Sequence, residues 1–364
     1  MKAFLILLST VVLLIQSCVG IAPDDELIEV AQFDKSMAIG LSVNHSNRIF
    51  VSFPNYDGAG NLALAELIGG ELVPYPNAKW NQKGAYENHF LRVQDLFVDA
   101  NDFLWVLDSR PAPAGNIFAN SVVEEEGLFK LVKINTKNNQ VEDVFFFDDL
   151  DKSKSALNDV RIDTDRSLAY LSDPGLASIV VLDLQTKQSR SVLSHTAFTR
   201  AEDIVLEYDG VKMQDNDGKP FSSNINSIAL TQDFKYFYFK PINKQNLYRI
   251  ETNYLANPQL SDADLQDKVE DLGKVGITHG MIADKRGNVY FASSEEYAIA
   301  YITPDGVRKI LIEDPNLIWS DSFGISSDDY LYFTCAQLQR LPQWNNGEDK
   351  TEYPYRAFKV KLPL

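Results

Sequence analysis

Polar side chains recur at one position of a pattern that the chain repeats six times. The position lies five residues before the turn of each copy, and five copies fill it with Gln94, Asn158, Asn226, His279 and Asp321. An imidazole can exchange a proton near neutral pH, a carboxylate can orient it or share that proton, and carboxamides can hold ligand oxygens. These types predict proton transfer or binding of a small polar ligand. His279 and Asp321 are the candidate catalytic residues, and the three amides are candidate ligand contacts.

The first copy has Ile39 at the same position. A closed ring of ligands around a metal ion would need an oxygen or nitrogen donor there, whereas a pocket for an organic molecule can use an apolar wall. The row therefore favours a one-sided pocket for an organic ligand over a metal cage.

Each copy of the pattern reads as a β-hairpin, in which alternating apolar residues lead to a short polar turn and then to an apolar strand. The residues that open the turns are Asn44, Asp99, Asp163, Thr231, Asp284 and Ser326. Five residues later the strands begin, at Ile49, Leu104, Leu168, Tyr236, Val289 and Leu331. The aspartates that open turns, together with Asp95 and Asp159, are better explained as acceptors for backbone amides than as functional groups.

Further strand-like segments lie between the copies, at residues 128–147, 177–194 and 298–313. With four strands in each of six units, we expect an all-β chain, a six-bladed β-propeller with four-stranded blades, which hides its sheet edges by closing into a ring. Residues 26–33 should pair with the last blade near residues 358–362, and residues 258–271 should form at most one short helix. Since the first strand of each blade lines the channel, the polar row should face the channel at one level.

Length and composition agree with one domain. The chain has 364 residues, of which 45% are hydrophobic and 11% aromatic, and no linker or low-complexity tract separates the repeats. We expect a single propeller over residues 24–364, of undetermined oligomeric state. The net charge of −17 argues against nucleic acid and anionic membranes as partners and weakly favours cationic or neutral ligands, although an acidic soluble surface is its commoner cause.

Residues 1–20 are expected to be a signal peptide, because Lys2 precedes an apolar run that is too short to span a bilayer. Cleavage after Gly20 would release a secreted protein with no transmembrane span. As an alternative, residues 14–18 resemble a bacterial lipoprotein signal, in which cleavage before Cys18 would leave the chain lipid-anchored through that cysteine. In the mature chain Cys335 then has no disulfide partner, and its place on a strand predicts a buried apolar residue rather than a nucleophile.

Two long loops, residues 111–127 and 337–355, are expected to leave the second strands at the ligand end of the channel. Their aromatic residues, which could wall a pocket for a flat ligand, are Phe118, Trp344, Tyr353 and Tyr355. Lys240, where the second strand of the fourth copy ends, and Glu295 are further candidate ligand contacts. Asp321 or the Glu295–Glu296 pair could supply the counter-charge for an amine.

Several segments, in order along the chain, resemble the yellow / major royal jelly protein family, bacterial members of which are described as dopachrome-tautomerase-related. They include VQDLFVDANDFLWVLDS (residues 93–109), LNDVRID (157–163), residues 273–299 and residues 314–362. The resemblance implies a six-bladed propeller with a ligand pocket at one tunnel end. It implies no single activity, because some members convert dopachrome, some bind biogenic amines and others are storage or structural proteins.

The chain departs from the family pattern at the polar row. Where the family usually has Asp-Gly, this sequence has Asn226-Ser227 and His279-Gly280, and where it usually has Pro-Asp, this sequence has Ser320-Asp321. Lys240 stands where a Cys or Arg commonly precedes Pro. These differences limit what can be carried over from the family about catalysis.

Three functions are compatible with these residues. The first is binding of a small aromatic or amine ligand with isomerase activity of the dopachrome-converting kind, and the second is ligand binding without catalysis. The third is a metal-dependent lactonase of the gluconolactonase type, with Asn158 as a ligand for Ca²⁺. It is the least favoured, because the first copy offers Ile39 where such enzymes have Glu and because His279 is a poor calcium ligand. No cofactor is otherwise predicted.

Overall fold

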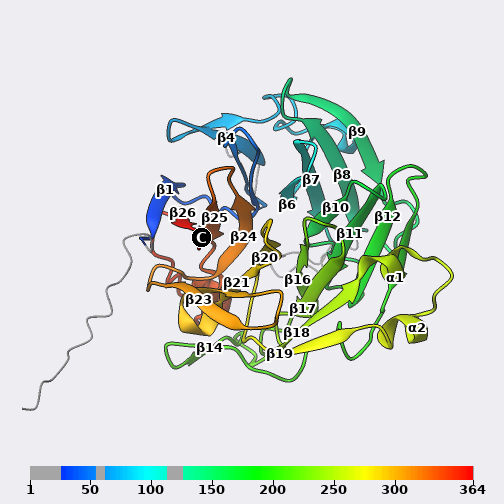
Figure 1. The fold of residues 1–364 in the computed structure, drawn as a ribbon. Coiled ribbons are helices and arrows are strands. Elements are labelled where there is room, and N and C mark those ends of the chain that lie inside the picture. The colour runs from blue at the N-terminus through cyan, green and yellow to red at the C-terminus, as the bar shows by residue number, and fades with distance from the viewer. Residues whose placement is uncertain (1–25, 55–61, 113–125, 364) are drawn as a thin grey trace, which may run out of the picture.

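The computed structural model describes residues 26–54, 62–112 and 126–363. The expected signal peptide, Cys18 and Phe118 lie outside these ranges. Six four-stranded antiparallel sheets are arranged around one axis, which confirms the six-bladed β-propeller (Figure 1). The inner strand of each blade either contains the row position of one repeat or begins two residues after it. None of the helices within the described ranges is long and apolar enough to cross a membrane.

The blades follow one another along the chain. Blade 1 consists of β2 (Leu41–Val43), β3 (Ile49–Ser52), β4 (Leu64–Ile68) and β5 (Glu71–Pro74). Blade 2 consists of β6 (Val93–Val98), β7 (Phe103–Arg110), β8 (Leu128–Asn135) and β9 (Gln140–Phe146). Blade 3 consists of β10 (Val160–Asp163), β11 (Leu168–Asp173), β12 (Ser178–Asp183) and β13 (Ser189–Val192).

The second half of the ring has the same plan. Blade 4 consists of β16 (Ile225–Leu230), β17 (Tyr236–Pro241), β18 (Asn246–Glu251) and β19 (Glu270–Lys274). Blade 5 consists of β20 (Met281–Ala283), β21 (Val289–Ser293), β22 (Ala298–Ile302) and β23 (Arg308–Glu313). Blade 6 consists of β24 (Ser320–Ile325), β25 (Tyr330–Cys335), β26 (Arg356–Lys361) and, from the other end of the chain, β1 (Ile28–Gln32).

The ring is closed by the pairing of its first and last strands. β1 runs antiparallel to β26, with Ile28 opposite Lys359 and Gln32 opposite Arg356. This confirms the pairing expected for residues 26–33. Because both ends of the chain contribute to one sheet, blade 6 joins the two ends of the ring.

Segments outside the blades are short. Helices α1 (Thr252–Ala256) and α2 (Asp262–Gln266) connect β18 to β19. Between blades 3 and 4 the chain forms the small hairpin β14 (Glu207–Tyr208) and β15 (Val211–Lys212). Leu206, Tyr208, Met213 and Phe221 from this region are buried in the same core as Trp319 of blade 6. The segment is therefore packed across the end of the tunnel rather than projecting from it.

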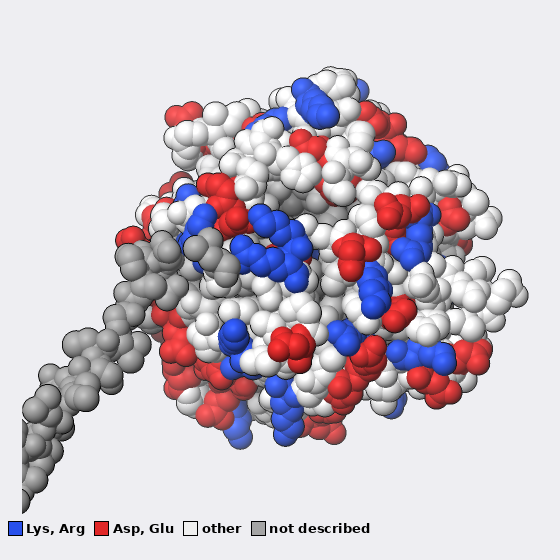
Figure 2. Space-filling model, in the orientation of Figure 1, with Lys and Arg blue, Asp and Glu red and all other residues white. Residues whose placement is uncertain are grey.

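The protein surface mixes both signs of charge. On the face seen in Figure 2, Lys and Arg side chains alternate with Asp and Glu over most of the blades. The acidic excess on this face is thus spread out, as expected for a soluble surface.

The turn-opening residues satisfy backbone amides, as the sequence indicated. Asp99 Oδ1 accepts hydrogen bonds from the amides of Asn101 and Phe103 at 2.9 and 3.0 Å, and Oδ2 accepts from Trp105 Nε1 at 2.7 Å. Asp284 accepts in the same way from the amides of Arg286 and Asn288. These carboxylates stabilise the hairpins of the repeat.

Replacing Asp99 by Ala should therefore destabilise the propeller. The substitution leaves two backbone donors and one indole donor without their acceptor, which costs roughly 2–4 kcal/mol of unfolding free energy. Urea unfolding followed by circular dichroism measures this loss. Asp148→Ala, at an exposed carboxylate, is the control and should change stability by less than about 0.5 kcal/mol. Equal stability of the two variants would contradict the role assigned to Asp99.

Candidate functional site

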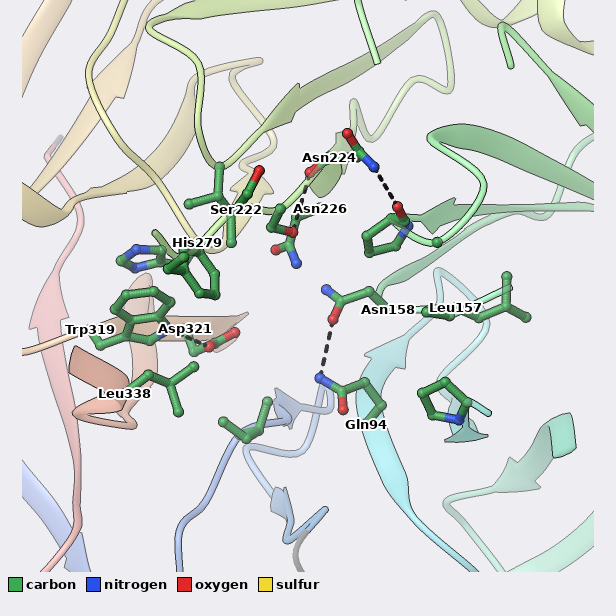
Figure 3. Close-up of a pocket in the computed structure, with 18 of the residues that line it drawn as sticks. Gln94, Leu157, Asn158, Ser222, Asn224, Asn226, His279, Trp319, Asp321 and Leu338 are labelled. Atoms are coloured by element: carbon green, nitrogen blue, oxygen red, sulfur yellow. Dashed lines mark hydrogen bonds between the residues drawn. The ribbon is translucent and has the colours of Figure 1, made fainter. Parts of the chain in front are cut away.

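A cavity of about 480 Å³ lies at one end of the tunnel, and every blade contributes the same register position to its wall. These residues are Ile39, Gln94, Asn158, Asn226, His279 and Asp321. Figure 3 shows His279, Trp319, Asp321 and Leu338 on one side of the cavity and Gln94 and Asn158 on the opposite side. The cavity thus has a wall of rings and aliphatic groups that faces a wall of carboxamides.

β-Bulges turn several of these side chains towards the axis. The regular pairing of β6 with β7 shifts between Val93 and Asp95, which isolates Gln94. The pairing of β16 with β17 shifts between Ile225 and Ser227, which isolates Asn226. β24 has a comparable shift between Ser320 and Phe323. A bulged residue leaves the ladder and can be re-aimed, and bulges are common beside functional sites for this reason.

His279 is buried in the cavity wall, and its ring is stacked on the indole of Trp319. The ring centroids are 3.6 Å apart and the planes differ by 8°. Among the described residues neither ring nitrogen of His279 has a hydrogen-bond partner. Burial, reinforced by the nearby charge of Lys240, lowers the pKa of His279 well below 6.5. The imidazole is therefore neutral at physiological pH and has unused hydrogen-bonding capacity.

A close backbone approach joins His279 to the next blade. A Cβ atom placed on Gly280 would lie 1.8 Å from the carbonyl oxygen of Asp321. Only glycine allows the chain after His279 to come this near to β24. The two candidate catalytic residues therefore lie on backbone segments in direct contact.

Asp321 is half-buried and faces the cavity. Its Oδ2 accepts a hydrogen bond from Trp319 Nε1 at 3.2 Å. Burial, and then the charge of Asp95, raise the pKa of the Asp321 carboxyl to about 8, although the indole hydrogen bond acts in the opposite direction. At neutral pH most of this carboxyl is protonated, so the empty cavity has no strong negative charge at this wall.

The opposite wall is a short chain of amides. Gln94 Nε2 donates to Asn158 Oδ1 at 3.2 Å, and Asn158 Nδ2 donates to Asp159 Oδ1 at 2.7 Å. Each amide in this assignment is oriented by its neighbour, so the wall presents donors and acceptors in a set arrangement. Burial, and next the charge of Asp95, raise the pKa of Asp159.

A buried ion pair joins the inner strands of blades 2 and 3. Arg161 Nη1 lies 3.1 Å from Asp95 Oδ2, and Arg161 Nη2 donates to the carbonyl of Met281 at 2.8 Å. Asp95 also accepts from the Val160 amide and from Ser322 Oγ. These contacts connect blades 2, 3, 5 and 6 next to the residues that line the cavity.

Among the other predicted contacts, Trp344 lines the cavity and lies edge-on to Phe221 at 5.7 Å. Tyr355 is buried in a core and Tyr353 is exposed, so neither belongs to the cavity wall. Phe118 lies outside the described residues.

Lys240 and Glu295 do not line the cavity. Lys240 is fully buried behind it, where its Nζ donates to the carbonyls of Pro241 and Lys244 at 2.9 and 2.7 Å. Glu295 lines a separate pocket of about 300 Å³ beside Glu296 and Arg308. Lys240 lies near the end of β17, as the repeat indicated, but its side chain is not part of the cavity wall. Neither residue shares the cavity of the polar row.

The sequence interpretation missed part of the wall. Asp215 and residues 219–224, which follow the β14–β15 hairpin, line the cavity together with Trp319, Leu338 and Arg92. The available signal was the interval from Asp163 to Thr231, the longest between successive turns. Among the described residues no group of three or more His, Cys, Asp or Glu is arranged to hold a metal ion.

Comparison with solved structures shows a shared fold. The chain is similar to a luciferin-regenerating enzyme (TM-score 0.53, 12% identity, 90% of this chain and 92% of the other). It is also similar to regucalcin of Agrobacterium tumefaciens, described as a calcium-binding protein (TM-score 0.52, 14% identity, 91% of this chain and 93% of the other). A third similar structure is a gluconolactonase of Xanthomonas campestris (TM-score 0.50, 10% identity, 93% of this chain and 99% of the other). At such low identity these likenesses concern the fold alone.

Comparison of sequences identifies the family. The chain is 23% identical over 307 residues to protein yellow of Drosophila pseudoobscura pseudoobscura, covering 79% of this chain and 50% of the relative. It is 22% identical over 261 residues to protein yellow of Drosophila melanogaster, covering 67% and 47%. The chain thus spans about half the length of these relatives. The profile of the major royal jelly protein family matches residues 92–361, and the chain belongs to this family.

Proposed function

We propose that this propeller binds a small aromatic amine in the cavity at the end of its tunnel. The observation behind the proposal is the Asp321 carboxyl, which is hydrogen-bonded to Trp319 in a cavity whose walls offer aromatic rings on one side and carboxamides on the other. An aromatic ring suits the side of Trp344 and Phe221, and hydroxyl or carbonyl groups suit Gln94 and Asn158.

A cationic ligand would change the protonation of Asp321. The carboxyl is largely protonated in the empty cavity because ionisation there is unfavourable. An ammonium group beside it would favour the carboxylate, so binding at neutral pH would release a proton to solvent. His279, as a neutral imidazole, could accept a second hydrogen bond from the ligand.

The unpartnered imidazole supports a second candidate, an isomerase that moves a proton from carbon in a dopachrome-like substrate. His279 would accept the proton, Asp321 in its protonated form would donate a hydrogen bond to a substrate oxygen, and the carboxamides would hold the remaining oxygens. A calcium-dependent lactonase has less support, since Ile39 gives the first blade no metal ligand and Asn158 is engaged with Gln94 and Asp159.

We further propose that the protein acts outside the cytoplasm. The apolar run after Lys2 would direct export, and cleavage either after Gly20 or before Cys18 would give a secreted or a lipid-anchored protein. The intact mass of the mature chain distinguishes the two, because lipid attachment adds fatty acyl groups to Cys18.

Amine affinity should depend on pH through Asp321. Below the carboxyl pKa of about 8, the affinity for dopamine, serotonin or tyramine should rise about tenfold for each pH unit, because binding requires the carboxylate. Above that pH the affinity should level off. It should fall again only near pH 10, where an alkylammonium group of pKa about 10 loses its proton. Isothermal titration calorimetry at pH 6, 7 and 8 measures the profile.

Asp321→Asn should remove this pH dependence and weaken binding at pH 8 by about tenfold or more, since a charge-assisted hydrogen bond is lost. Glu71→Gln, at an exposed position of β5, is the control and should bind as the wild type does. A wild-type affinity that is flat from pH 6 to 8, or absent at millimolar amine, would contradict the binding proposal.

The isomerase candidate predicts that purified protein accelerates the loss of the visible absorbance of L-dopachrome. His279→Ala should slow this reaction by about a hundredfold or more, as expected when a general base is removed. His195→Ala, at an exposed histidine, should retain the wild-type rate. If the wild type and His279→Ala are equally active, His279 is not the base, and if the wild type is inactive, the isomerase candidate falls.

A further inference from the structure

Trp319 contacts both candidate catalytic residues although it was not part of the predicted polar row. One face of its indole covers the His279 ring at 3.6 Å, and its Nε1 donates to Asp321 Oδ2 at 3.2 Å. We infer that Trp319 is the positioning residue of the cavity, which fixes the plane of the His279 imidazole and the orientation of the Asp321 carboxyl. The inference deepens the proposed function, since it concerns the same two groups.

The backbone of Trp319 is held in an unusual conformation. Its φ is +56°, in the left-handed region that a bulky residue rarely adopts. The irregularity of β24 begins at the next residue, Ser320. Strain of this kind persists only where the surroundings impose it, and it is concentrated at ligand sites. In a regular strand, the side chains of residues 319 and 321 would point to one face of the sheet and that of residue 320 to the other. This alternation alone would not place the Trp319 indole parallel to the His279 ring of the neighbouring blade.

Surrounding rings hold the indole in place. Trp319 is 1% exposed. Phe221 lies edge-on to it at 5.6 Å, and Tyr208 is tilted against it at 6.2 Å. Both come from the segment between blades 3 and 4 that covers the tunnel end. That segment therefore supports the catalytic candidates through Trp319.

The indole is the hydrogen-bond donor that favours the ionised form of Asp321. The other charged or titratable groups near this carboxyl come from several blades. They are Asp95 on β6, Asp159 directly before β10, Arg161 on β10, His279 before β20, and Cys335 on β25. The neutral His279 adds no charge, and Arg161 is paired with Asp95. Loss of the Trp319 donor should therefore make ionisation of Asp321 harder.

The test uses Trp319→Phe, which keeps an aromatic ring over His279 and removes the donor. In ligand-free protein labelled with 13C at the aspartate carboxyl, the Asp321 resonance is identified by its absence from Asp321→Asn. Its midpoint should lie near 8 in the wild type and about one pH unit or more higher in the variant. Dopamine affinity at pH 7 should fall about tenfold. The pH at which the affinity levels off should rise by about one unit, as the Asp321 midpoint does.

Trp105→Phe is a matched control, because Trp105 Nε1 makes the same indole–carboxylate hydrogen bond to Asp99 at 2.7 Å in a turn of blade 2. It should leave the Asp321 midpoint unchanged even if it lowers stability. A measurement on the wild type needs no variant: the Nε1–H resonance of Trp319 should titrate with the midpoint of Asp321.

Two results would overturn the inference. One is an Asp321 midpoint that is unchanged in folded Trp319→Phe, and the other is a Trp319 Nε1–H resonance that does not shift as Asp321 titrates. Failure of the wild type to bind amines, with the Asp321 midpoint shifted as expected, would overturn only the proposed function. The two failures are thus separated by the ligand-free titration.

Discussion

The ion pair between Arg161 and Asp95 joins the inner strands of four blades, and four residues that line the cavity, Gln94, Asn158, His279 and Asp321, stand one or two positions away from its contacts along the chain. Two charges buried on the axis are unfavourable unless their remaining hydrogen bonds are satisfied. Here Asp95 accepts from Arg161, the Val160 amide and Ser322, while Arg161 reaches across to the carbonyl of Met281. Such a pair contributes geometry more than stability. It ties the inner strands of blades 2, 3, 5 and 6 to one another across the ring.

Burial also explains why the two candidate catalytic groups are largely neutral in a protein of net charge −17. Burial penalises the charged form of any group, so it lowers the pKa of His279 and raises that of Asp321. The nearby charges add to both effects, since Lys240 opposes a cation on His279 and Asp95 opposes an anion on Asp321. The outcome is a neutral base and a largely neutral acid on touching backbone segments. A ligand that carries a charge, or that exchanges a proton with these groups, would favour their ionised forms, which burial disfavours.

The repeat predicted the six blades, the closing strand and the residues of the polar row, because all three follow from hairpin periodicity. It could not predict the bulges at Gln94 and Asn226, which depend on how one strand is held by its neighbours. Lys240 and Glu295 do not line the same cavity as the polar row, since position along a strand indicates a level in the propeller but not the direction of a side chain. Trp319 was missed because its left-handed backbone follows from tertiary packing, and no periodic pattern signals it.

The departures from the family pattern distinguish positions that are constrained by the backbone from positions whose side chains face the cavity. At the register of the row, Gly280 is retained beside His279 because the carbonyl of Asp321 leaves no room for a Cβ atom. The equivalent position in blade 4 is Ser227, whose Oγ donates to the carbonyl of Thr278 in the next blade. A larger residue is thus accepted where it can make a bond between blades. The preceding residue has no such constraint, because its side chain ends in the cavity. Changes at this one register can therefore alter the chemistry of the pocket while the propeller stays the same, which is how one fold can serve several functions within a family.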